Sequence, residues 1–281
     1  MKLAQGSPVL DALNAARLAL ALVTESAQAE AETLLMVVLG CRRADLFILR
    51  EPLSAQQAQL LEQMVQRRCG LEPLQYITGR AAFRGAEFEV GPGVLVPRPE
   101  TELVVEHALA LLPSTDGARV IDIGTGSGAI GASIAAERPR VSVWATEVSP
   151  QAAEWARRNF ARLGVSVELF EGDLFCGLRG PFDLVVSNPP YLSSDEVDDL
   201  PFDVATHEPR IALTAGPTGL EVPARIIEQS ATRLAPRGAL VMETSPTHAS
   251  ELASLFERVL REVAVHDDLG GNARIVTGRG A

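Results

Sequence analysis

Hydrophobic residues recur at two different periods along this chain, and the change of period divides it into parts. From about residue 8 to residue 70 they recur every three or four positions, as at Leu10, Leu13 and Leu20, a spacing that predicts amphipathic helices. Ser54-Ala-Gln-Gln57 has the form of a capping box at the start of one of these helices. The pattern therefore predicts a small helical domain over residues 1–70.

The helical period stops near residue 71, and a short alternating pattern follows. Phe83, Phe88 and Val90 alternate with polar residues around Gly85, as in a β-hairpin. We predict a linker with a β-hairpin over 71–96. Apolar residues on one face of 101–112 then predict a helix that packs on the next domain.

Beyond residue 118 short apolar runs alternate with helical patterns. Strands are predicted at 119–123, 141–145, 165–170, 181–186, 239–243, 263–266 and 274–277, and helices at 129–137, 150–161, 221–234 and 246–260. This alternation predicts an α/β domain with a doubly wound sheet, and the two closely spaced final strands predict an antiparallel edge hairpin. Residues 192–220, rich in proline and glycine, are predicted to form a long functional loop.

Candidate ligand-binding groups follow three successive strands. Gly124-Thr125-Gly126-Ser127-Gly128 leads into a helix, where glycines allow the backbone to approach a ligand at the helix N-terminus, although the spacing is not that of the dinucleotide fingerprint. Glu147, about 20 residues further on, is suited to accept hydrogen bonds from ribose hydroxyls. Asp173 is suited to accept from an adenine amino group while Leu174 packs against the ring. Each acid alone is more often a solvated strand end, but their order predicts a nucleoside-sulfonium site.

The fourth strand ends in Ser187-Asn188-Pro189-Pro190-Tyr191. Two prolines fix the backbone and remove two donors, so the carbonyls and the Asn188 side-chain oxygen form a rigid group of acceptors, with the flat ring of Tyr191 beside them. Such a pocket suits a planar group that carries an NH2. The alternative is a simple Asn-Pro turn that closes a loop. The binding interpretation requires open space between Asn188 and Gly124–Gly128.

Two other segments are candidates for the substrate side of a cleft. Arg98 and Glu100 lie in a stretch stiffened by prolines, and Glu208 precedes Pro209 in the predicted loop. The alternative for the first pair is a helix entry with an acidic residue in its first turn.

The formal net charge of −11 is unevenly shared. Residues 1–80 hold eight basic and eight acidic residues, which leaves 17 basic and 28 acidic residues in the remainder, and Lys2 is the only lysine. A surface that binds a nucleic-acid backbone needs clustered lysine and arginine, so nucleic acid is an unlikely partner.

Three widely spaced cysteines and four scattered histidines indicate neither a disulfide framework nor a metal site. No apolar run approaches the ~18 residues that span a bilayer, and no basic-then-apolar leader precedes the first helix. We expect no membrane association and a cytoplasmic protein.

Several motifs together resemble the release-factor glutamine methyltransferases, the PrmC/HemK family, over nearly the whole chain. They are Pro73-Leu-Gln-Tyr76, Gly93-Val-Leu-Val-Pro-Arg-Pro-Glu-Thr-Glu102, Asp122-Ile-Gly-Thr-Gly-Ser-Gly128, Asn188-Pro-Pro-Tyr191, Glu208-Pro-Arg210 with Ala212-Leu213, and Asp268-Leu-Gly-Gly271 running into Gly278-Arg279. Asn-Pro-Pro-Tyr is shared with other amino-methyltransferases, whereas Pro-Arg-Pro-Glu-Thr-Glu is more specific to this family.

The resemblance implies methyl transfer from S-adenosylmethionine, giving S-adenosylhomocysteine, to the glutamine amide in the Gly-Gly-Gln loop of peptide-chain release factors. It implies a Rossmann-like, seven-stranded class I methyltransferase domain over 97–281, with an N-terminal helical domain that recognises the substrate. The resemblance adds Asp122 and Asn188 to the expected cofactor-binding residues, which otherwise are Gly124–Gly128, Glu147, Asp173 and Leu174. Asn188, Pro189 and Tyr191 are the expected catalytic residues, and a monomer is expected.

One residue and two short segments depart from the family pattern. Glu147 stands where the family usually has aspartate, which should keep the ribose contact. Glu243-Thr244-Ser245 and Ala205-Thr206-His207 also differ, and they lie near the expected substrate side. The open alternatives are therefore a paralogue that methylates another amide or amino group, an adenine-N6 nucleic-acid methyltransferase that uses the same pocket on a flipped base, and a non-catalytic module that keeps the fold.

Overall fold

The computed structural model describes residues 2–3 and 6–281, which its contacts divide into two units. Unit 1 comprises Met1–Gly79 with Phe202–His207, and unit 2 comprises Arg80–Pro201 with Glu208–Ala281. The finer division into 1–70, 71–96 and 97–281 stays a prediction. None of the helices in the described ranges has the length and apolar character needed to cross a membrane.

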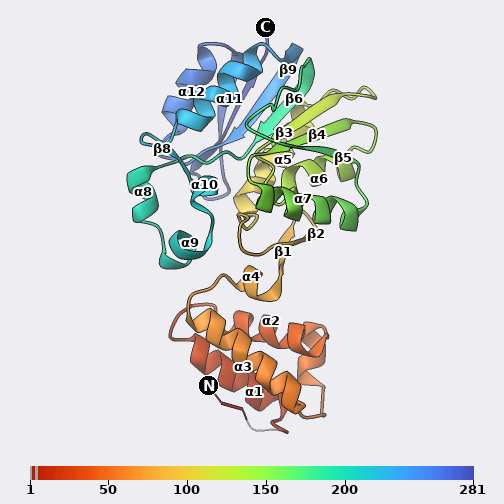
Figure 1. Ribbon diagram of the computed structural model, residues 1–281, viewed down its shortest axis with the longest axis vertical. Helices are drawn as coiled ribbons and strands as arrows, with labels where there is room; N and C mark the ends of the chain where they lie inside the picture. Colours follow the sequence, from red (N-terminus) through yellow and green to blue (C-terminus); the bar gives the residue numbers. More distant parts are fainter. Residues whose placement is uncertain (1, 4–5) are drawn as a thin grey trace. The chain divides into compact units, whose positions relative to one another are not determined.

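Unit 1 is helical, as the three-to-four-residue period predicted (Figure 1). Its elements are α1 (Val9–Leu20), α2 (Ala27–Leu39), η1 (Arg43–Phe47), α3 (Ala55–Cys69), α4 (Leu74–Thr78) and α9 (Phe202–His207). Leu20, Leu34 and Leu61 are fully buried in its core. The capping box at α3 is confirmed, since Gln57 N donates to Ser54 Oγ at 3.2 Å and Ser54 N donates to Gln57 Oε1 at 2.9 Å.

Unit 2 contains a seven-stranded sheet with the order β10-β11-β9-β6-β3-β4-β5. Its strands are β3 (Arg119–Ile123), β4 (Ser142–Glu147), β5 (Val167–Glu171), β6 (Phe182–Ser187), β9 (Leu234–Glu243), β10 (Arg261–Asp267) and β11 (Ala273–Arg279). The first five run parallel, and β11 runs antiparallel to both β9 and β10. The predicted α/β class and antiparallel edge hairpin are confirmed.

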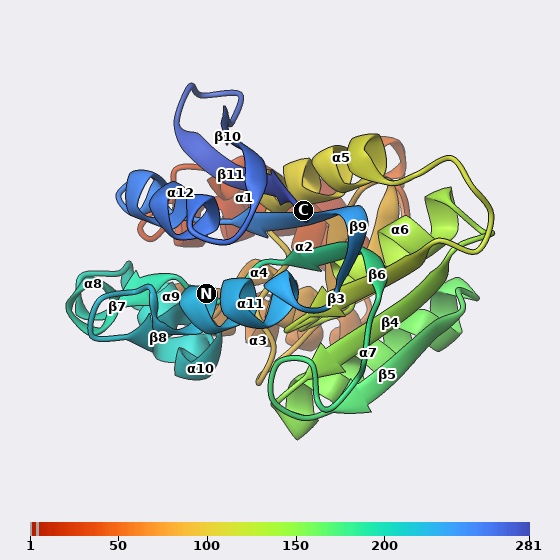
Figure 2. The same ribbon diagram turned by 90° about the horizontal axis from the view of Figure 1, so that it is seen from above.

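Helices cover both faces of this sheet, with α5 and α6 on one side and α11 and α12 on the other (Figure 2). They are α5 (Glu102–Leu111), α6 (Ala129–Glu137), α7 (Pro150–Leu163), α11 (Glu221–Ala231) and α12 (Ala249–Glu257). Neighbouring residues of β3 alternate between the two cores: Val120 packs with α5, α6 and α7, and Ile121 packs with α11 and α12. Burial on both faces explains why these strands read as continuous apolar runs.

The predicted β-hairpin is present as β1 (Arg80–Phe83) and β2 (Ala86–Glu89). Phe83 and Phe88 meet edge to face at 6.0 Å between ring centroids and belong to the core under α5. The hairpin is therefore part of the sheet-bearing unit.

Two sequence expectations need correction. Residues 73–79, within the predicted linker, contain the short helix α4. Residues 192–220, read as a loop, contain β7 (Leu192–Ser193), α8 (Ser194–Asp198), α9, α10 (Arg210–Leu213) and β8 (Thr214–Gly216). Each of these elements has six residues or fewer, too few to establish a period. The short 3-10 helix η2 (Pro99–Thr101) likewise precedes α5.

Candidate active site

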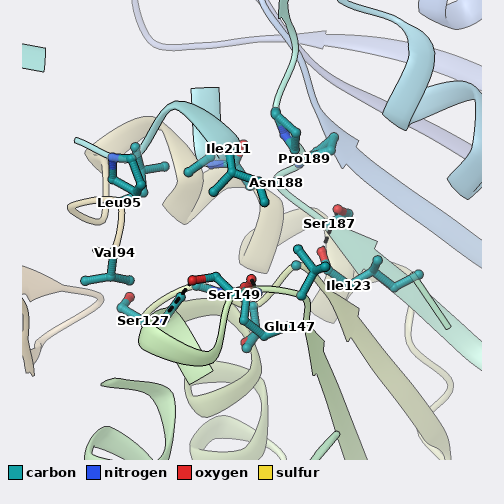
Figure 3. Close-up of a pocket in the computed structure, with 18 of the residues that line it drawn as sticks. Val94, Leu95, Ile123, Ser127, Glu147, Ser149, Ser187, Asn188, Pro189 and Ile211 are labelled. Carbon is teal, nitrogen blue, oxygen red and sulfur yellow. Dashed lines mark hydrogen bonds between the residues drawn. The ribbon is translucent and has the colours of Figure 1, made fainter. Parts of the chain in front are cut away.

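A cavity of about 300 Å³ lies within unit 2 at the carboxyl ends of the parallel strands (Figure 3). One side consists of Gly124–Ser127, Glu147 and Ser149, which we call the glycine wall. Asn188 and Pro189 face Ser127, Glu147 and Ser149 across the cavity and, with the lining residue Pro190, form what we call the proline wall. The open space required between Asn188 and the glycine loop is present.

The glycine loop is held from beneath by Asp122 at the end of β3. Thr125 Oγ1 donates to Asp122 Oδ2 at 2.5 Å, and Gly131 N of α6 donates to the same oxygen at 3.0 Å. Asp122 is fully buried and does not line the cavity, and burial raises its pKa to about 7. Its position is that of a residue that organises the loop.

Three glycines of this loop adopt positive φ, which other residues avoid. Gly124, Gly126 and Gly128 have φ of 69°, 57° and 85°. A Cβ on Gly128 would lie 2.6 Å from Cε1 of Phe160. Gly128 is therefore required for the start of α6, and it does not itself line the cavity.

Glu147 ends β4 and lines the cavity. Gly126 N donates to its Oε2 at 2.9 Å and Ser149 N donates to its Oε1 at 2.8 Å. Burial raises the pKa of this carboxyl. Because a carboxylate offers about four acceptor sites, two remain for a ligand with paired hydroxyls.

Asp173 and Leu174 follow β5 and line the same cavity. Leu174 is buried, whereas the exposed Asp173 forms an ion pair with Arg225 of α11. Any ligand amino group at Asp173 would share that carboxylate with Arg225.

The side chain of Asn188 has a defined orientation. Its Nδ2 donates to Oγ1 of Thr101 at 3.0 Å, so its Oδ1 is the atom left to accept. Pro189 and Pro190 line the cavity beside it. Tyr191 does not line the cavity; its hydroxyl donates to Oε1 of Glu243 at 3.3 Å.

Arg98 and Glu208, each predicted as a cleft residue, pair with each other. Arg98 Nη2 lies 2.8 Å from Oε1 and 2.7 Å from Oε2 of Glu208. Arg98 lines the cavity, whereas Glu208 is buried and not part of the lining. Glu100 is exposed and also lies outside the lining.

Thr101 and Glu243 are site residues that sequence reasoning missed. Both are almost completely buried and both contact the Asn188–Tyr191 motif. Glu243 was noted only as part of a departure from a family pattern. The available signal was that it ends a parallel strand adjacent to the strand of Asn188, as ligand-binding residues of such sheets do.

Two protein-family models match this chain. Residues 100–270 match the methyltransferase small domain, and residues 11–79 match the PrmC N-terminal domain. Together the two matches cover most of both structural units.

Curated relatives match over nearly the full length. The release factor glutamine methyltransferase of Koribacter versatilis is 40% identical over 91% of this chain and 92% of its own. That of Deinococcus radiodurans is 38% identical with the same coverage, and that of Streptomyces coelicolor is 40% identical, again over 91% and 92% of the two chains.

Solved structures support the fold. A methyltransferase from Pyrococcus furiosus superposes with a TM-score of 0.53 at 21% identity, over 82% of this chain and 100% of that chain. The 16S rRNA N2 G1207 methyltransferase of Thermus thermophilus gives a TM-score of 0.53 at 20% identity, over 72% and 50% of the two chains. These likenesses show the fold of the seven-stranded sheet, and the match to the methyltransferase small domain covers residues 100–270 of the same unit.

Proposed function

The chain belongs to the release factor glutamine methyltransferase family, and from this premise we propose that it transfers a methyl group from S-adenosylmethionine to a release-factor glutamine. The acceptor atom is the side-chain amide nitrogen of the glutamine in the Gly-Gly-Gln motif. The proposal extends to a monomeric enzyme that acts in the cytoplasm.

The glycine wall fits S-adenosylmethionine. Gly124 and Gly126 let the backbone approach the ligand at the start of α6, and Glu147 has acceptor sites left for the ribose hydroxyls. Asp173 and Leu174 would receive the adenine end. When bound there, S-adenosylmethionine supplies a methyl group made electrophilic by its sulfonium.

The proline wall fits a primary carboxamide. Asn188 Oδ1 and the Pro189 carbonyl would accept the two hydrogens of the glutamine NH2 and fix the orientation of its nitrogen. An amide nitrogen is a poor nucleophile because its lone pair is delocalised. Acceptors on both hydrogens favour charge on nitrogen and align its lone pair, so positioning and electrostatics supply most of the catalysis.

The observation that carries this proposal is the orientation of Asn188. Because Nδ2 is used by Thr101, the group free to act in the cavity is an oxygen, which matches a substrate that brings hydrogens. An Asn188 that presented its NH2 would suit a carbonyl instead.

The experiment is incubation with labelled S-adenosylmethionine and a purified release factor, followed by mass spectrometry. We expect one methyl group on the glutamine of the Gly-Gly-Gln motif. A release factor with asparagine at that position serves as the control and should remain unlabelled. Methylation at another residue would contradict the assigned acceptor. So would the absence of methylation by a folded enzyme that binds S-adenosylmethionine.

A further inference from the structure

Behind the proline wall lies a polar network that reaches the cavity through Asn188 and Thr101, both of which line it. It joins Thr101 of η2, Glu243 at the end of β9 and Arg274 of β11. The Thr101 hydroxyl accepts from Asn188 Nδ2 at 3.0 Å, and the Tyr191 hydroxyl donates to Glu243 Oε1 at 3.3 Å. The Thr101 hydroxyl also faces the Glu243 carboxyl as a donor that lowers its pKa. Glu243 is 1% exposed, and within the described part of the chain its Oε2 makes no hydrogen bond.

The direction of donation in this network decides what Asn188 presents. A hydroxyl has one hydrogen, so Thr101 can donate either to Glu243 or to Asn188, but not to both. An ionised Glu243 only accepts, which commits the Thr101 hydrogen to Glu243 and leaves the Thr101 oxygen to accept from Asn188 Nδ2. With that order Asn188 Oδ1 points away from Thr101 and is available to a substrate amide.

We propose that Glu243 is a positioning residue for methyl transfer, which acts through the Thr101 hydroxyl to keep the Asn188 side-chain oxygen directed at the acceptor nitrogen. This inference rests on the proposed function for its kinetic test. The geometry of the network, however, can be tested without the release factor.

The charges around Glu243 make the network responsive to pH. Burial raises the pKa of Glu243 to about 7. The Thr101 hydroxyl and the positive charge of Arg274 lower this pKa, but their effect is smaller than that of burial. Glu100 raises it further, Tyr191 donates a hydrogen bond, and Arg274 is itself paired with Asp268. Once protonated, Glu243 is able to donate to Thr101, and the order of donation is no longer fixed.

The kinetic test compares variants of nearly constant shape. Thr101→Val removes the hydroxyl and should lower kcat by about 10-fold to 100-fold, while Thr101→Ser should retain kcat within about 3-fold. The dissociation constant for S-adenosylmethionine should stay within about 2-fold in both. Thr244→Val is the matched control. Thr244 directly follows Glu243, is buried like Thr101, and within the described residues its hydroxyl has no hydrogen-bond partner.

Glu243→Gln tests the acceptor itself. We expect kcat of the wild type to fall as the pH drops through about 7, and we expect this dependence to disappear in Glu243→Gln, with kcat low at every pH. Equal losses in Thr101→Val and Thr101→Ser, or a pH profile unchanged by Glu243→Gln, would overturn the inference.

A spectroscopic arm separates this inference from the proposed function. The side-chain NH2 signals of Asn188, assigned by their loss in Asn188→Ala, should shift with pH in the wild type and lose that response in Thr101→Val. This measurement needs only the folded protein with S-adenosylmethionine. If the wild type fails to methylate a release factor but these signals behave as expected, the acceptor assignment fails and the network stands. If the Asn188 signals change neither with pH nor on Thr101→Val, the proposed role of Glu243 and Thr101 is wrong.

Discussion

The two walls of the cavity are built in different ways. The glycine wall consists mainly of backbone groups of one short loop, fixed by the carboxylates of Asp122 and Glu147 at the ends of two adjacent strands. The proline wall depends on side chains from distant parts of the chain: Asn188 is held by Thr101, 87 residues away, and Arg98 by Glu208, 110 residues away.

This difference corresponds to what each wall has to do. A cofactor brings its own reactivity and needs a rigid surface with a few acceptors. Backbone groups and strand ends provide such a surface within a short stretch of sequence. The acceptor amide brings little reactivity, so its wall must hold side-chain atoms in one orientation. We therefore expect changes at the glycine wall to affect cofactor affinity and changes at the proline wall to affect kcat.

The largest expected effect is that of Asn188→Ala. The substitution removes the side-chain oxygen that we propose accepts from the glutamine NH2, and we expect kcat to fall by about a thousandfold, equivalent to about 4 kcal/mol in the barrier. The dissociation constant for S-adenosylmethionine, measured by calorimetry, should change by less than about 3-fold. A loss of cofactor affinity as large as the loss of kcat would mean that the two walls do not have separate roles.

The second effect concerns stability at the proline wall. In Arg98→Met the buried Glu208 carboxylate loses its guanidinium, and we expect a loss of about 3 kcal/mol in the free energy of unfolding, measured with denaturant. The double variant with Glu208→Gln should recover most of it. Arg140→Met is the control, because its ion pair with Asp116 is exposed and should contribute less than about 1 kcal/mol. A single variant as stable as the wild type would mean that the pair contributes nothing to the wall.

Most of the fold and the glycine wall could be predicted from the sequence because their signals are local. A glycine loop, the strand before it and the helix after it occupy about 20 consecutive residues, and Glu147 follows at the end of the next strand. The apolar runs that became β3, β4, β6 and β9 were recognisable because both faces of the sheet are buried.

The proline wall could be predicted only in part. Asn188 and its prolines are a contiguous motif, but their partner Thr101 follows from packing, not from spacing. Arg98 and Glu208 were each placed at a cleft, and nothing in their surroundings indicated that they bind each other. Tyr191 was expected to face the acceptor, whereas its hydroxyl is directed to Glu243.

The third effect tests whether Asp122 supports the glycine loop. The pKa of its carboxyl rises from an ordinary 3.8 to about 7 because it is buried. A group whose folded-state pKa is raised gives stability that is fully present below its unfolded pKa and is lost as the pH rises through the folded pKa. The wild type should therefore lose stability from this group between about pH 4 and pH 7.

Asp122→Asn has no charge to bury, so it should become more stable relative to the wild type over that pH range. The full shift corresponds to about 4 kcal/mol, and we expect about half, because an amide oxygen accepts from Thr125 less strongly than a carboxylate. Unfolding at pH 4 and pH 8 gives the comparison. A difference between the two proteins that does not grow with pH would show that Asp122 is not buried in its charged form.

The smallest effect, and the direct counterpart of Asn188→Ala, is that of Glu147→Gln. Both Glu147 oxygens accept from backbone N–H groups, and glutamine would turn an NH2 toward either Gly126 N or Ser149 N. We expect the affinity for S-adenosylmethionine to fall by about 10-fold, equivalent to about 1.4 kcal/mol and typical of one lost charge-assisted hydrogen bond. At saturating cofactor kcat should be nearly unchanged, since in the proposed mechanism the opposite wall orients the acceptor amide. If kcat fell while cofactor affinity held, the glycine wall would be acting on the transferred methyl, and the separation of the two walls into binding and catalysis would be wrong.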